Sequence, residues 1–171
     1  MPLYLKGFGP ERTAFLQRGG GVTEVLHAHQ LLYLLESNTR DMDCPDCEIE
    51  LVAFAVPPEY AEYIRGSEST VGLCPRCLSL EPVAEQPPDE PAFDRIGDAF
   101  PSSRDAGVPL ALLLGLLSNL ALYRSEISSL LEDVERAGTD PLLVLDRLDR
   151  DPTIETEIDL SGRRRQLEQL L

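Results

Sequence analysis

Four cysteines in two matched pairs constrain this chain more than any other feature of its sequence. The first pair is Cys44-Pro-Asp-Cys47, and after 26 further residues the second pair follows as Cys74-Pro-Arg-Cys77. Two residues between paired cysteines allow a tight turn that directs both sulfurs at one ion, and the proline presets the backbone of that turn. The repeated pattern predicts that all four thiolates bind one metal ion.

Zinc is the metal that a set of four cysteines favours. Zn²⁺ takes four soft or borderline ligands in a tetrahedron, and a site without an open position is structural rather than catalytic. We therefore expect one structural Zn²⁺, held by Cys44, Cys47, Cys74 and Cys77.

Two alternatives to zinc remain open. Iron sites of the rubredoxin type also use paired cysteines. Such sites usually have glycine after each pair, however, where this chain has Glu48 and Leu78. A dithiol redox site is the second alternative, and the lack of a surrounding βαβ pattern disfavours it.

The segment between the cysteine pairs predicts a small antiparallel sheet. Residues 49–56 and 69–73 are rich in β-branched and apolar side chains, and residues 78–83 can add a third strand. The order pair, strand, return strand, pair brings the four cysteines together in space. We expect residues 42–83 to form a zinc ribbon of two to three strands, in which the metal contributes folding free energy that so small a sheet lacks.

Residues 84–107 and 108–171 differ sharply in composition. The first segment is rich in proline and acidic residues, which is typical of an extended linker. Within it, Phe93, Ile96 and Phe100 have the spacing of a single turn that could dock on the ribbon or on the helices. The second segment is rich in leucine and predicts a helical region.

The helical region is expected to contain three helices. Apolar residues recur every three or four positions from about residue 108 to 137, which predicts one long helix with a coiled-coil seam. Shorter helices are expected at residues 141–149 and about 159–171, and short connections favour an antiparallel hairpin or bundle. The predicted fold class is therefore α+β: a zinc ribbon, an acidic linker and a three-helix unit. The seam consists of Leu113, Leu116, Leu120, Tyr123, Ile127, Leu130 and Val134.

The first 41 residues differ in charge from the rest of the chain. They carry four basic and four acidic side chains, whereas residues 42–171 carry 11 basic and 26 acidic ones and hence the whole net charge of -15. Met42 stands two residues before the first cysteine, so we expect translation to begin there and residues 1–41 to be upstream sequence. The alternative is a genuine extension with one docking helix at about residues 23–37.

The acidic composition bears on environment and partners. The chain has 30 acidic against 15 basic residues and one lysine, Lys6, a balance typical of proteins from a cytosol of molar salt. An acidic protein of an ordinary cytosol is the alternative. Nucleic acid and anionic lipid are polyanions, so both are disfavoured as partners.

Membrane insertion and secretion are not expected. The most apolar stretch, residues 108–117, is shorter than the roughly 20 residues that a membrane-spanning helix needs. The N-terminus shows no signal-peptide pattern. We therefore expect a cytoplasmic protein. In the cytoplasm, four cysteines favour a metal site over disulfides.

No catalytic constellation is apparent in the sequence. The two histidines, His27 and His29, both precede Met42, and no phosphate-binding glycine loop occurs. We expect no enzyme and no small-molecule substrate, but a zinc-ribbon interaction or adaptor protein. Its partner would be another protein, or a second copy bound through the long helix. A transcription-associated ribbon that contacts polymerase or nucleic acid is the alternative.

From Met42 onward the sequence resembles an uncharacterised family of small haloarchaeal zinc-ribbon proteins, a domain of unknown function. The resemblance covers residues 42–171 and implies a halophilic cytosol, with the four cysteines as metal ligands, and it brings no known activity. Members often have glycine at the position of Glu48, so this chain departs from the family pattern there. The segments that carry the resemblance are MDCPDC, ELVAFAVPPEY, CPRCL, DPLLVLDRL and RRRQLEQLL.

Overall fold

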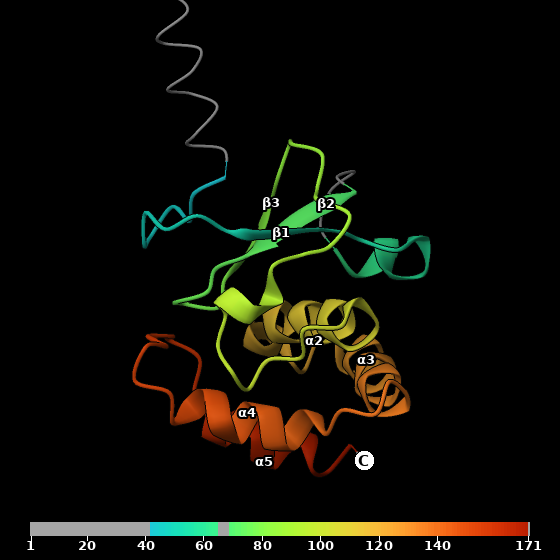
Figure 1. The fold of residues 1–171 in the computed structure, drawn as a ribbon. Coiled ribbons are helices and arrows are strands. Elements are labelled where there is room, and N and C mark those ends of the chain that lie inside the picture. Colours follow the sequence, from blue (N-terminus) through green and yellow to red (C-terminus); the bar gives the residue numbers. More distant parts are fainter. Residues whose placement is uncertain (1–41, 65–68, 171) are drawn as a thin grey trace, which may run out of the picture. The chain divides into compact units, whose positions relative to one another are not determined.

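The computed structural model describes residues 42–64 and 69–170, which belong to one compact unit. A three-stranded antiparallel sheet comes first along the chain, and helices follow it (Figure 1). This arrangement confirms the α+β class. The predicted helix at residues 23–37 and the predicted start at Met42 concern residues 1–41, which lie outside the described part.

The sheet consists of the three predicted strands, each shorter than expected. They are β1 (Val52–Ala55), β2 (Thr70–Leu73) and β3 (Leu80–Pro82), in the spatial order β1-β2-β3. Leu73 is the Cα partner of Val52 on one side and of Leu80 on the other. A 3₁₀ helix, η1 (Pro58–Tyr63), follows β1, because the prolines at its start cannot continue a ladder of hydrogen bonds.

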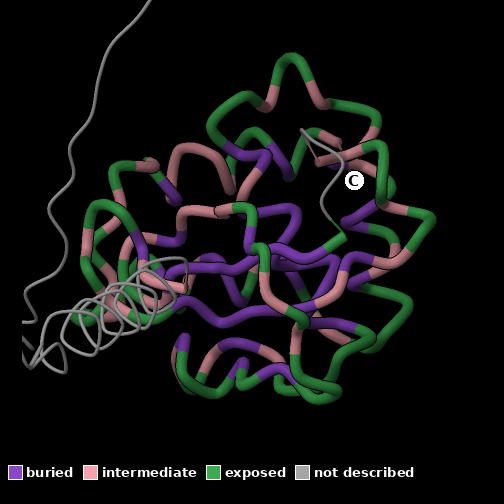
Figure 2. The backbone as a smooth tube through the Cα atoms, turned by 90° about the horizontal axis from the view of Figure 1, so that it is seen from above, coloured by how far each residue is buried: buried purple, intermediate pink, exposed green. Residues whose placement is uncertain are grey.

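Helix α2 (Arg104–Leu116) forms the centre of the fold. Every residue from Ala106 to Leu114 is buried, as expected for a helix that is apolar all round. In Figure 1 it lies between the sheet and the C-terminal helices, and Figure 2 shows buried backbone running through the interior. Neither α2 nor any other helix in the described ranges has the length and apolar character needed to cross a bilayer.

The prediction of one long helix over residues 108–137 is wrong. The chain forms α2, a short 3₁₀ turn η3 (Leu117–Asn119) and a separate helix α3 (Arg124–Arg136). A straight helix cannot pack on itself, whereas the break lets α3 turn back and bury Ile127, Leu130 and Val134 against the core. The apolar face that the regular spacing creates on α3 therefore packs against the core of the same chain.

Two further helices complete the described part. They are α4 (Pro141–Asp149) and α5 (Leu160–Leu167), so this part holds four α-helices where three were expected. The Asp140 carboxylate caps α4 by accepting a hydrogen bond of 3.0 Å from the Leu143 backbone N–H. Helix α5 is shorter than the predicted range of 159–171.

The acidic segment at residues 84–107 is anchored at its second half. Its 3₁₀ turn η2 (Phe93–Arg95) inserts Phe93 into the core, where the ring centroid lies 5.6 Å from that of Phe54 and 5.4 Å from that of Phe100. Ile96 is buried beside them. The predicted docking turn therefore packs on both the sheet and the helices, in contrast to an extended linker, and all of these elements share one hydrophobic core.

Two glycines allow α2 to approach its neighbours closely. A Cβ atom at Gly107 would lie 2.5 Å from Cδ2 of Phe93, and one at Gly115 would lie 2.8 Å from Cδ2 of Leu80. Both distances are shorter than any ordinary contact between carbon atoms. Glycine at these positions therefore sets the distance from α2 to η2 and to β3.

Replacing Gly107 with alanine tests this close packing. We expect Gly107→Ala to lower the free energy of unfolding by about 1–3 kcal/mol, because the overpacking outweighs the roughly 1 kcal/mol that alanine gains in a helix. Ser129→Ala on the exposed face of α3 is the matched control and should leave the stability unchanged or slightly raised. Urea denaturation of both variants measures the difference, and equal stabilities would contradict the packing argument.

Candidate metal centre

The two cysteine pairs form turns with the same hydrogen bonds. The carbonyl of Cys44 accepts a bond of 2.9 Å from the Glu48 N–H, and the carbonyl of Cys74 accepts one of 3.1 Å from the Leu78 N–H. In each turn the N–H of the first cysteine donates to the carbonyl five residues further on, at 2.8 and 2.9 Å. The repeated sequence thus folds into a repeated structure, and we refer to these turns as the first and second knuckle.

The knuckles bring all four predicted ligands together. The sulfur atoms of Cys44, Cys47, Cys74 and Cys77 lie within 4.8 Å of one another, and the Cys44 and Cys77 sulfurs are 3.6 Å apart. A tetrahedral site with Zn–S distances of about 2.3 Å has sulfur–sulfur edges of about 3.8 Å. The four cysteines are therefore positioned to bind one metal ion.

The electrostatics of the cluster favour a cation at its centre. Burial, followed by hydrogen bonds with Cys77 and Cys74 and repulsion from the charge of these two thiolates, raises the pKa of Cys47 to about 12. Burial also raises the pKa of Cys44, but hydrogen bonds from Ser79 and from backbone N–H groups outweigh it and leave the pKa at about 7. Four adjacent thiolates repel one another, so a bound cation is needed to hold all of them in the charged form.

A left-handed backbone closes each knuckle without glycine. Glu48 has φ = 54° and Leu78 has φ = 60°, a region that costs most residues free energy and favours glycine. The Glu48 side chain is exposed, whereas Leu78 is fully buried in the main hydrophobic core. Leu78 thus attaches the second knuckle to the rest of the fold.

The connection between α4 and α5 also holds the second knuckle. The Glu155 N–H donates a hydrogen bond of 2.9 Å to the Arg76 carbonyl, and the two side chains form an ion pair. Both side chains are substantially exposed, so the backbone bond matters more than the ion pair. No local sequence signal predicts this contact, because the two residues are 79 positions apart in the chain.

A small apolar cluster encloses the other side of the cysteines. Leu51 and Val83 are buried against Cys44 and Cys74, and this cluster is separate from the main core. The cluster leaves no room beside Gly72, where a Cβ atom would lie 2.7 Å from the Cβ of Leu51. The sulfur atoms are therefore shielded by apolar side chains on the sheet side.

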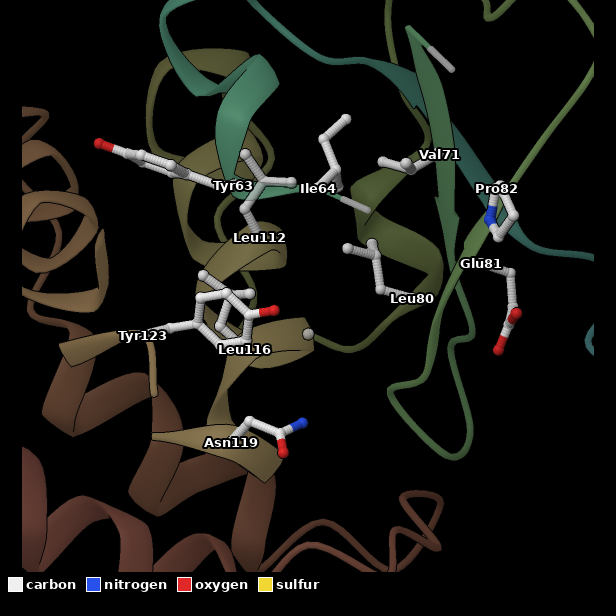
Figure 3. A pocket seen from close by; sticks show the side chains of 11 residues that line it. Tyr63, Ile64, Val71, Leu80, Glu81, Pro82, Leu112, Leu116, Asn119 and Tyr123 are labelled. Atoms are coloured by element: carbon white, nitrogen blue, oxygen red, sulfur yellow. The ribbon is translucent and has the colours of Figure 1, made fainter. Parts of the chain in front are cut away.

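A hollow of about 270 Å³ lies where β3 faces α2 (Figure 3). Its walls are mostly apolar, with Leu80 from the sheet and Leu112 and Leu116 from α2. The lining also includes Glu81, Asn119 and the two tyrosines Tyr63 and Tyr123. The hollow offers a surface for apolar contact.

Glu48, which is exposed and has a left-handed backbone, allows a direct test of the knuckle geometry. Glu48→Gly should keep or raise the free energy of unfolding, by up to about 1 kcal/mol, because glycine adopts φ = 54° without strain. Glu48→Val should lower it, since a β-branched side chain is strained there. Thermal unfolding of both metal-loaded variants measures the effect. A valine variant as stable as the glycine variant would show that the backbone at residue 48 is not left-handed.

Comparison with known proteins identifies a family for almost the whole described part. A family model described as a family of unknown function (DUF6276) matches residues 43–171. A comparison with curated proteins finds no match, and a comparison with solved structures finds none either. The matched range begins next to Met42 and includes both knuckles and all the helices. The chain therefore belongs to this family of unknown function, DUF6276.

Proposed function

We propose that the protein is a non-enzymatic adaptor in which one structural Zn²⁺, bound by the four cysteines, holds a zinc ribbon together. The convergence of four sulfur atoms from two matched knuckles carries this proposal. Four cysteine ligands complete the coordination of zinc and leave no position for a substrate. A metal of this kind supplies folding free energy to the ribbon instead of Lewis-acid chemistry.

The choice of zinc over iron needs an argument beyond the sequence. The lack of glycine after each cysteine pair disfavours iron from the sequence alone. In the structure, however, Glu48 and Leu78 adopt the left-handed backbone that glycine would adopt, so this argument no longer separates the two metals. We favour zinc because the two knuckles flank a three-stranded sheet and share a small separate apolar cluster, and closed four-cysteine sites in such small units are typical of structural zinc.

Metal analysis of the purified full chain tests the site. We expect one zinc per chain and no visible absorption, whereas bound iron would colour the protein. Cys74→Ser should lose the zinc and should unfold at lower temperature, because the remaining ligands are left without their fourth partner. A chelator should destabilise the wild type and have no further effect on Cys74→Ser. A wild type that is fully stable without metal would contradict a structural role.

The proposed partner is another protein, acting in a cytosol of high salt. Three residues of the expected seam are buried within the chain and are not available for contact with a second copy, which disfavours a dimer through a long helix. They are Ile127, Leu130 and Val134. Residues 42–83 contain eight acidic residues and only Arg65 and Arg76 as basic ones, which disfavours nucleic acid. The acidic, lysine-poor composition supports the haloarchaeal setting that the resemblance implies.

Isolation of partners in a haloarchaeal host tests the adaptor function. A C-terminally tagged chain, purified in molar KCl, should retain one protein in stoichiometric amount, and mass spectrometry identifies it. Cys74→Ser should lose that protein, whereas the exposed control Ser129→Ala should retain it. Recovery of the tagged chain alone from cells that express it normally would contradict the adaptor proposal.

A further inference from the structure

We infer that a cleft beside the second knuckle binds an arginine-bearing segment of the partner protein. This inference rests on the proposed adaptor function and names its binding site. The cleft has a volume of about 560 Å³ and borders the sulfur cluster at Cys47 and Cys77. The knuckles form one wall, with Asp46 and Ser79, and the α4–α5 connection forms another, with residues 155–158. Helix α2 contributes residues 114 and 115, and the turn η3 contributes Ser118.

The deeper lining of the cleft is apolar. Leu78 and Leu114 are fully buried beneath it, while Leu80 and Ile158 are partly exposed along it. Leu80 and Gly115 also line the hollow shown in Figure 3. The cleft and the hollow therefore adjoin, and together they offer an apolar surface that could accommodate a side-chain stem and an apolar neighbour.

Carboxylates surround this apolar surface. Asp46, Glu155 and Glu157 are exposed lining residues, and no arginine, lysine or histidine is found among the described residues that line the cleft. Glu155 is engaged with Arg76. Asp46 and Glu157 form no ion pair with any residue that the structure describes. The cleft therefore combines an apolar floor with two carboxylates, Asp46 from the first knuckle and Glu157 from the α4–α5 connection.

Arginine is the side chain that matches this combination. Its guanidinium donates to carboxylates in a planar fork, is more weakly hydrated than an ammonium group and lies readily against apolar surface. Lysine presents a compact, strongly hydrated charge, and an acidic or phosphorylated segment would be repelled. Charge complementarity thus selects a basic protein segment with an aliphatic residue beside the arginine.

The cleft also links recognition to the metal site. Cys47 and Cys77 are among its lining residues, and the turn that carries Ser79 is part of the second knuckle. Loss of the metal would therefore disturb one wall of the cleft directly. This gives a structural reason for a partner to depend on intact cysteines.

A peptide titration of the metal-loaded full chain, followed by NMR of backbone amides, tests the assignment. The probe is N-acetyl-Leu-Arg-Leu-amide, and the same peptide with glutamine in place of arginine is its control. We expect saturable shifts at Ser79, Ser118 and Thr156 with the arginine peptide. The variant Asp46→Asn/Glu157→Gln should weaken binding about tenfold. Glu132→Gln/Glu135→Gln on α3, with the same change of charge, should not weaken it.

Several results would overturn the inference. These are equal binding of the glutamine peptide, shifts that map elsewhere, no saturable shift, or equal weakening by both double variants. Binding of free arginine as tight as that of the peptide would assign the cleft to a small molecule instead. The partner isolation separates this inference from the adaptor proposal. If Asp46→Asn/Glu157→Gln retains the partner, the adaptor function stands and the cleft is not its site.

Discussion

The burial of α2 on every side is the constraint on which the rest of the structure depends. A helix with no polar face must be covered by several elements, and here the sheet, η2, α3 and the C-terminal helices supply that cover. Close approach is possible because Gly107 lies against Phe93 and Gly115 against Leu80. The same packing fixes β3 and the turn before it, so the position of the second knuckle follows from the position of α2.

A metal ion bound by the four cysteines would stabilise the same small sheet that the hydrophobic core supports. One side of the sheet packs on the main core, and the other carries the cysteines and their own apolar cluster. Leu78 joins the two, because it ends a knuckle with a strained backbone and fills the core with its side chain. Metal binding would thus add folding free energy to the sheet and to its contact with α2.

The exposed surface is where the proposed function would reside. The surface of the described residues has hollows between the elements and many exposed carboxylates. The apolar seam residues of α3, which suggested a dimer, are instead buried inside the chain. The adjoining cleft and hollow lie where the knuckles, β3 and the α4–α5 connection meet over α2. A partner that binds there would contact segments whose relative positions depend on both the metal centre and the core.

The sequence alone determined the features that rest on local chemistry. The two cysteine pairs, the strands between them and the helix at residues 141–149 follow from short-range rules, and the structure has them where the sequence predicts them. Only the tertiary structure decided where the apolar seam breaks, because both a straight helix and a broken one satisfy the same spacing. Tertiary structure likewise decided that Phe93 fills the core and that Glu155 holds Arg76. Such contacts join residues distant in sequence, and their free energy exists only once the chain has folded.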